Sequence, residues 1–470
     1  MKTGTITGRE AAGRAAREHT KRSSHRQVGQ IARDPLDLLA MGSVGRVPKL
    51  VSLRYGRMLA SPFAFFVGSA ILQAHDLSLV PNTGMAIPIC GDAHLLNFGA
   101  FATPERQLVF DFKDFDEVST APWEWDLKRL VASLVLAARH RRFSRGMAET
   151  LVMSAVGEYR DRTRQYAEYG ALDLWHEKTT FDRMIETALT PEARRPIRRA
   201  MEKAASRTHE SQLDKLVHRD GEHWTIRDAP PSTFHVHRAS TLFEPDDAWF
   251  EAGQWRRQIG TTIDGYQKTL APDRRELLGH FELQDLAFSV AGAGEVGARC
   301  LMLLAADHRG KPLFLQIKEA YRPALANFFR STVVKHEGSR VVEGERLLQA
   351  EDDIFLGWST GPAGRQFYFR QLRDMKLAAD IDLLDGALLA DYARLCGWAM
   401  ARAHAKAGDA AIPVAAYIGR GDAFAEALTG YAFAYADQVE RDHDVFVKAV
   451  RRGALDARTD DQMAADFGSS

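Results

Sequence analysis

Two periods of apolar residues alternate along this chain and divide it into sections. Before residue 280 the spacing is mostly helical, with the strongest runs at Trp123–Arg139 and Arg145–Tyr166. From Asp285 the pattern changes to short apolar stretches separated by turn residues. Helical spacing returns at Leu384–Ala407 and Asp422–Val450. The sequence therefore predicts an α+β protein whose β part is a middle section of the chain.

Prolines divide the predicted helices of residues 9–80. We expect breaks at Pro35, Pro48 and Pro62, because proline lacks the N–H group that a helix interior needs. Two short apolar runs follow, Ala86–Cys90 and Leu108–Phe112, and each has the length of a buried strand. Polar residues come directly after each run, so the two strand ends are candidate functional positions.

The middle section predicts strands joined by turns. A strand at Asp285–Val290 leads into a glycine-rich loop, and a hairpin turn at Asp307–Lys311 separates the next two strands. A helix is expected at Arg340–Ala350, with further strands at Ile354–Trp358 and Gln366–Gln371. This order predicts a small antiparallel β unit.

Composition narrows the classes of protein. Among 470 residues there are 62 Lys+Arg and 62 Asp+Glu, so the near-zero net charge gives no general attraction to nucleic acid or anionic membranes. No apolar run is long enough to span a bilayer. The three cysteines, Cys90, Cys300 and Cys396, show no paired spacing, which fits a reducing compartment. We expect a cytoplasmic protein with neither a membrane nor a nucleic-acid partner.

An acidic stretch, residues 89–117, holds a histidine, an asparagine and several carboxylates close to the two predicted strands. Carboxylates at the ends of buried strands are costly unless a metal, a hydrogen-bond network or a substrate compensates them. For Asp116 and Glu117, a solvated turn is the better interpretation. Asp126, in the following helix, is interpreted as a structural acceptor.

The spacing of the remaining polar residues indicates phosphoryl transfer. Asp92 and Asn97 are spaced like the base and the metal-binding asparagine of a protein-kinase catalytic loop. Asp111 begins an Asp-Phe pair, as the metal-binding aspartate of such sites does. We interpret Asp92 as the base, with Asn97 and Asp111 as Mg²⁺ ligands. Asp114 supports a second ion or orients the first.

His94 lies inside the same loop. Its interpretation here is a hydrogen-bonding role within the catalytic loop, with a metal-ligand role as the alternative.

A second half-motif lies about two hundred residues downstream. Gly292, Gly294 and Gly297 form a G-x-G-x-x-G, which is a weak signal alone. The glycines are followed by a strand, a turn and a strand that carries Lys318, which is the arrangement of a kinase nucleotide lid. The lysine of such a lid is held by a carboxylate on the next helix. Glu343 is the first candidate, and Glu345 is the second.

The two half-motifs agree on one chemistry, but their order is reversed relative to protein kinases. Either the fold is circularly permuted or one match is accidental. Permutation is physically permissible, because chain termini are commonly close together at the surface.

The chain resembles a bacterial family known as domain of unknown function 2252. The resemblance rests on R-Y-G-R-M, C-G-D-A-H-L-L-N-F-G, F-D-F-K-D-F-D-E, W-D-L-K-R-L, Q-I-K-E-A and V-V-E-G-E-R-L-L-Q, within Arg54–Asp442. The family is similar to protein-kinase-like and aminoglycoside-phosphotransferase folds. This chain has Val67 where the family usually has arginine, which puts a phosphate contact in doubt unless Arg54 or Arg57 replaces it.

We therefore expect a two-lobed, kinase-like α+β fold with permuted lobe order that uses ATP and Mg²⁺ on an unknown, small-molecule acceptor. The expected divisions are an N-terminal helical segment, the catalytic-loop half of a large helical lobe, a small β lobe, and C-terminal helices completing the large lobe: 1–80, 81–280, 281–375 and 376–470. The alternatives are a catalytically weak, pseudokinase-like nucleotide-binding module, a nucleotidyl transferase, and a metal-dependent hydrolase using His94 and the carboxylates.

Overall fold

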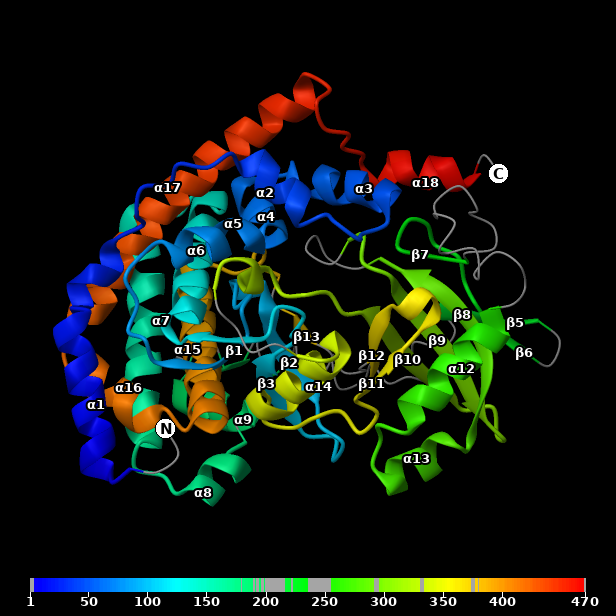
Figure 1. Ribbon diagram of the computed structural model, residues 1–470, viewed down its shortest axis with the longest axis horizontal. Helices are drawn as coiled ribbons and strands as arrows, with labels where there is room; N and C mark the ends of the chain where they lie inside the picture. Colours follow the sequence, from blue (N-terminus) through cyan, green and yellow to red (C-terminus); the bar gives the residue numbers. More distant parts are fainter. Residues whose placement is uncertain are drawn as a thin grey trace.

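The computed structural model describes residues 4–178, 180–188, 191, 194, 195, 198, 216–220, 223–235, 255–290, 296–329, 334–372, 377, 378 and 380–468. It is a mixed α+β structure, which confirms the expected class. The long helices lie on one side and a six-stranded sheet lies on the other (Figure 1).

The helices, in chain order, are α1 (Ile6–His19), α2 (Pro35–Met41), α3 (Pro48–Met58), α4 (Pro62–Gly68), α5 (Ala70–Ser78), α6 (Glu124–His140), α7 (Arg145–Tyr166), α8 (Ala171–His176), α9 (Phe181–Ala188), α12 (Trp255–Gln267), α13 (Pro272–Leu278), α14 (Glu337–Leu348), α15 (Gly386–Gly408), α16 (Ala411–Ile418), α17 (Ala423–Arg451) and α18 (Asp460–Gly468). The strands are β1 (Ala86–Ile89), β2 (Phe98–Ala102), β3 (Leu108–Phe112), β4 (Ser119–Pro122), β5 (Val217–Asp220), β6 (His223–Ile226), β7 (Thr233–Phe234), β8 (Phe281–Ser289), β9 (Cys300–Asp307), β10 (Pro312–Glu319), β11 (Gly357–Thr360), β12 (Gln366–Gln371) and β13 (Leu377–Ala378).

The helical side is built on α6, α7, α15 and α17, which pack against one another. Their shared core is rich in large, fully buried rings, among them Trp123, Tyr159 and Trp398. The sequence predicted α7 with its observed bounds and the other three within two residues. Strong apolar periodicity explains this success, because a helix with a wide apolar face has one way to bury it.

The six-stranded sheet has the order β11-β12-β10-β9-β8-β7, and every described pairing is antiparallel. The central strand β9 is buried on both faces. Leu301 and Leu303 join one apolar cluster, whereas Met302 and Leu304 join another cluster that includes residues of β5 and β6. Successive side chains of a strand point to opposite faces, so two covered faces require a continuous apolar run. The three predicted strands and the turn between the last two are confirmed, whereas most of the glycine loop lies outside the described residues.

The predicted proline breaks are helix starts. Pro35, Pro48 and Pro62 each occupy the first position of α2, α3 and α4. Proline is tolerated there because the first N–H groups of a helix have no intrahelical partner. At the other end of the chain, α18 packs on α3, and Arg458 N donates to Ser52 O (2.9 Å).

Short sheets join the two sides. The pair β1–β4 and the sheet β13-β2-β3 lie between the long helices and the large sheet (Figure 1). Helix α14 contacts β12 of the large sheet and α15 of the helical side. No described helix is both long and apolar enough to cross a membrane. The sequence also predicts a helix at Pro191–Ala204, and this segment lies largely outside the described residues.

Candidate functional site

The loop after β1 is held by a buried aspartate of α6. Asp126 Oδ2 accepts from Cys90 N (2.8 Å), and its Oδ1 accepts from Gly91 N (2.9 Å). Gly91 has φ +81°, and a Cβ there would lie 2.2 Å from Glu117 O, so only glycine fits where the two loops meet. His404 Nε2 lies 3.2 Å from Asp126 Oδ2. Asp126 therefore has the structural role expected from the sequence.

Asp92 begins the catalytic-loop candidate, and an arginine of α6 fixes its orientation. Arg129 Nε donates to Asp92 Oδ1 (2.7 Å). The same guanidinium donates to Gln73 Oε1 (3.2 Å) and Phe66 O (2.8 Å) and lies over the Phe66 ring. Arg129 is almost fully buried, whereas 22% of the Asp92 side chain is exposed. Asp92 is thus held through one oxygen and remains partly accessible.

His94 borders Asp92 as a neutral imidazole. Its Nδ1 accepts from Leu96 N (3.2 Å), which leaves the proton on Nε2, 3.7 Å from Asp92 Oδ2. Burial lowers the pKa of His94 to about 4, although the Asp92 charge opposes this effect. The tautomer follows from the hydrogen-bond pattern.

Asn97 joins the two halves of the acidic stretch. Its Nδ2 donates to Asp92 O (3.0 Å) and Asp114 O (3.1 Å), and its Oδ1 accepts from Asp114 N (2.9 Å). The side chain is buried. Asn97 therefore fixes the backbone of both aspartates relative to each other, and its Oδ1 retains a second lone pair.

Lys318 of β10 meets the acidic stretch. Its Nζ lies 2.9 Å from Asp114 Oδ2, between residues 204 positions apart in sequence, and 2.5 Å from Asp116 Oδ2. Tyr368 OH donates to Asp116 Oδ1 (2.8 Å). The lysine side chain is fully buried, whereas 23% of Asp114 and 32% of Asp116 are exposed. Lys318 of the second half-motif therefore meets Asp114 of the acidic stretch, which was predicted only as an auxiliary metal ligand.

Asp111 lies in a different environment from the other predicted metal ligands. Its Oδ2 is 2.7 Å from Arg402 Nη2 and also accepts from Ala350 N (2.8 Å). Both Asp111 and Arg402 are fully buried. This geometry gives Asp111 a structural role that joins β3 to α14 and α15. The residue of this stretch that faces Lys318 is Asp114, three positions later.

Helix α14 presents a different glutamate from the one preferred on sequence grounds. Glu343 is exposed, whereas Glu345 is fully buried. The helix is attached to the acidic loop by Arg340, which donates to Val118 O (2.6 Å) and Asp116 O (2.9 Å). Burial thus favours Glu345 over Glu343 as the α14 carboxylate that lies inside the protein.

The glycine loop is described only in part. Gly292 and Gly294 lie outside the described residues. Gly297 has φ +93°, and its carbonyl oxygen accepts from Val47 N (2.8 Å). The loop is therefore fixed, at its C-terminal end, by the chain between α2 and α3.

Four residues in this region were missed or misread from the sequence. Asp116 and Glu117 were interpreted as solvated, yet Asp116 binds Lys318 and Glu117 Oε2 accepts from Ala324 N (2.6 Å). Burial raises the pKa of Glu117 to about 7, and the charge of Asp92 adds to the effect. Arg129, within the W-D-L-K-R-L segment, and Arg340 were assigned no role from the sequence.

Two oxygen donors of this region could contribute to a magnesium site. The Asp114 carboxylate and Asn97 Oδ1 are hard oxygen donors. Within the described part of the chain, no group of three or more His, Cys, Asp or Glu side chains is arranged to hold a metal ion. Magnesium is usually bound by one or two carboxylates together with substrate phosphates.

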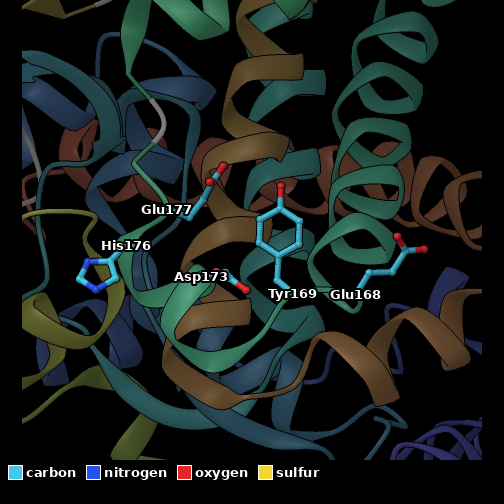
Figure 2. A pocket seen from close by; sticks show the side chains of 5 residues that line it. All are labelled: Glu168, Tyr169, Asp173, His176 and Glu177. Atoms are coloured by element: carbon cyan, nitrogen blue, oxygen red, sulfur yellow. The ribbon is translucent and has the colours of Figure 1, made fainter.

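A separate pocket lies at the end of α7 and around α8 (Figure 2). It has a volume of about 390 Å³ and is lined by Glu168, Tyr169, Asp173, His176 and Glu177. It shares no residue with the cluster formed by Asp92, Asn97, Asp114, Asp116, Arg129 and Lys318, which we call the Asp92–Lys318 cluster.

Comparison with known proteins gives one match. The model of a family described as an uncharacterized protein conserved in bacteria (DUF2252) matches residues 46–449. No curated protein and no solved structure matches this chain.

Proposed function

The chain belongs to the uncharacterized bacterial family DUF2252, and from its site geometry we propose that it is an ATP- and Mg²⁺-dependent phosphotransferase acting on a small-molecule acceptor. In this proposal the fold is kinase-like with the order of its two lobes permuted in the chain.

The meeting of Lys318 with Asp114 carries the proposal. The fully buried Lys318 lies 2.9 Å from the partly exposed Asp114, so a cation suited to phosphate is next to a carboxylate suited to a metal ion. Each half-motif was weak or moderate alone, and both predict phosphoryl transfer.

The strand order supports the same proposal. Strands β8, β9 and β10 are neighbours, and α14 follows β10 before the chain returns through β11 and β12. In protein kinases, the glycine-rich loop covers the phosphates, the lysine lies on the third strand, and a glutamate lies on the following helix. Lys318 and the buried Glu345 occupy corresponding positions in this order.

Each residue of the cluster then has a role. Bound magnesium would neutralise charge on the phosphates, held by Asp114 with Asn97 Oδ1 beside it. Lys318 would leave its two carboxylates for the phosphate oxygens. Asp92 would accept the proton of the acceptor hydroxyl as the new O–P bond forms and the bond to ADP breaks. Arg129 would hold Asp92 in place.

A catalytically weak, nucleotide-binding module is the second candidate. The half-buried Val67 stands where the resemblance implies an arginine, and this substitution favours reduced turnover. Nucleotidyl transfer would use the same residues and is distinguished by its product, pyrophosphate in place of ADP.

Thermal unfolding with ATP and Mg²⁺ tests the proposal. Saturation at a hundred times Kd should stabilise the protein by about 2.7 kcal/mol. Asp92→Asn should retain this stabilisation but form no ADP, whereas Lys318→Met should lose much of it. Glu343→Gln is the matched control, because Glu343 is exposed. A folded wild-type protein that ATP·Mg²⁺ does not stabilise would rule out both candidates.

A further inference from the structure

The segment between α2 and α3 is hydrogen-bonded to the described end of the glycine loop. Val47 N donates to Gly297 O (2.8 Å), and Arg46 Nη1 donates to Val296 O (2.8 Å). A Cβ at Gly297 would lie 3.1 Å from Arg46 Cβ. Arg46 is half-buried, so part of its side chain reaches the surface beside this loop.

A second arginine lies behind the first. Arg54 of α3 is only 4% exposed and donates to Ser43 Oγ (3.0 Å) and Gly68 O (2.7 Å). The carbonyl oxygen of Gly42 accepts from both guanidinium groups, from Arg46 Nε (3.1 Å) and Arg54 Nη1 (3.5 Å). Two positive charges therefore converge on one backbone oxygen.

Arg54 has no directly contacting carboxylate in the described part of the chain, although the charge of Glu117 acts on it without forming an ion pair. No carboxylate there forms an ion pair with it, and its buried Nε has no hydrogen-bond partner among the described residues. Burial, and then the charge of Arg46, lower the pKa of Arg54 to about 9, which leaves it charged at neutral pH. A buried charge without a partner is costly, so its retention points to a ligand that supplies the negative charge.

Neighbouring arginines differ in this respect. Arg57, one turn later on α3, lies 2.6 Å from Asp460. Arg299, which donates to Gly45 O, lies 3.0 Å from Glu319. Their charges are satisfied within the protein.

We propose that Arg46 and Arg54 form a phosphate-binding corner beside the glycine loop, in which Arg46 makes the contact and Arg54 strengthens the field behind it. The phosphate is either the terminal group of the nucleotide or a phosphate carried by the acceptor. The first of these rests on the proposed function. Arginine suits this task because its planar fork matches phosphate geometry.

Calorimetric titration with ATP·Mg²⁺, adenosine and inorganic phosphate tests the corner. The proteins are wild type, Arg46→Gln, Arg54→Met and the control Arg57→Gln. If the corner binds the nucleotide, Arg46→Gln should weaken ATP·Mg²⁺ binding about 10- to 100-fold and leave adenosine unchanged. If it binds the acceptor, the affinity for ATP·Mg²⁺ stays and binding of inorganic phosphate is lost. Arg57→Gln should change neither.

Arg46→Gln alone decides the outcome should Arg54→Met fail to fold, because Arg46 is only half-buried. Unchanged binding of both ATP·Mg²⁺ and phosphate by Arg46→Gln would overturn the corner. A wild-type protein that binds phosphate but not ATP·Mg²⁺ would overturn the proposed function alone, provided that Arg46→Gln loses the phosphate. A wild-type protein that binds neither would overturn both.

Discussion

Two aspartates that lie three residues apart in this chain each pair with a cation, and the two ion pairs differ in how far they are buried. Asp111 and Arg402 are 2.7 Å apart and both are fully buried. Asp114 and Lys318 are 2.9 Å apart, with the lysine fully buried and 23% of the aspartate exposed. The first pair is sealed inside the junction of β3, α14 and α15. The second pair has one member that solvent or a ligand can reach.

The difference separates a structural ion pair from a candidate functional one. A sealed pair cannot exchange its partner without unfolding its surroundings, whereas a pair with an exposed carboxylate can. Asp116 sharpens the contrast, because Lys318 is shared between two partly exposed carboxylates. Breaking the fully buried pair is therefore expected to lower the free energy of unfolding. Breaking the partly exposed pair is expected to change stability little and can instead change binding.

The largest effect is expected from breaking the sealed pair. Asp111→Ala leaves the buried guanidinium of Arg402 without its carboxylate, so the free energy of unfolding should fall by about 3–5 kcal/mol. Urea denaturation measures this loss. The double variant Asp111→Leu, Arg402→Met is the control and should recover part of the stability. A small loss in the single variant would contradict the structural role.

Asp114→Asn should act on turnover. Its carboxylate is partly exposed and Lys318 keeps Asp116 as a partner, so the free energy of unfolding should change by less than about 1 kcal/mol. ADP formation should fall about a hundredfold or more, because a charged group that acts on the phosphates is lost. Turnover equal to wild type would remove Asp114 from the site.

Lys318→Met should weaken nucleotide binding. Loss of one charge-assisted contact to phosphate should lower the affinity for ATP·Mg²⁺ about tenfold, measured by calorimetry. Binding of adenosine should be unchanged. An equal loss of both ligands would instead indicate a disturbed fold.

Glu117 and His94 should make the free energy of unfolding depend on pH in opposite directions. The pKa of Glu117 rises from 4.5 to about 7, so the native state holds a proton that the unfolded chain has lost, and stability falls as pH rises through this window. The pKa of His94 falls from 6.5 to about 4, so stability falls as pH decreases through that window. Urea denaturation at about pH 5 and 7 measures both effects. Between about pH 5 and 7, Glu117→Gln should become more stable relative to wild type, whereas His94→Gln should become less stable relative to wild type. Parallel shifts of both variants would contradict these environments.

The smallest effect on the free energy of unfolding is expected at Glu343, the residue predicted from the sequence to hold Lys318. Glu343→Gln should change the free energy of unfolding by no more than about 0.5 kcal/mol, because the side chain is exposed. Glu345→Gln on the same helix should cost more, because Glu345 is fully buried. Equal effects in thermal unfolding would show that burial does not separate the two glutamates.

Much of the fold could be predicted from local pattern. Strand β3 and helix α7 have their expected bounds, and β10 carries Lys318 after the predicted turn. These elements depend on periodicity and on turn residues, which are properties of neighbours in sequence. The family assignment came from short motifs, and the match over residues 46–449 confirms it.

The site could be predicted less well, because exposure and partner choice depend on residues far apart in the chain. The Asp-Phe pattern fits Asp111 and Asp114 equally, since each is followed by phenylalanine. Glu343 and Glu345 likewise lie one on each side of Gly344, and only packing decides which is buried.

The sequence by itself determined that this is an α+β chain with an Asp92–Asn97 loop and a lysine-bearing strand, because spacing within an element is encoded locally. Tertiary structure alone decided that Lys318 reaches Asp114, 204 positions earlier in the sequence, and also Asp116, that Arg129 holds Asp92, and that Asp111 is sealed against Arg402. The physical reason is that the cost of a charge depends on its burial and its partners, and both are fixed only when the chain folds.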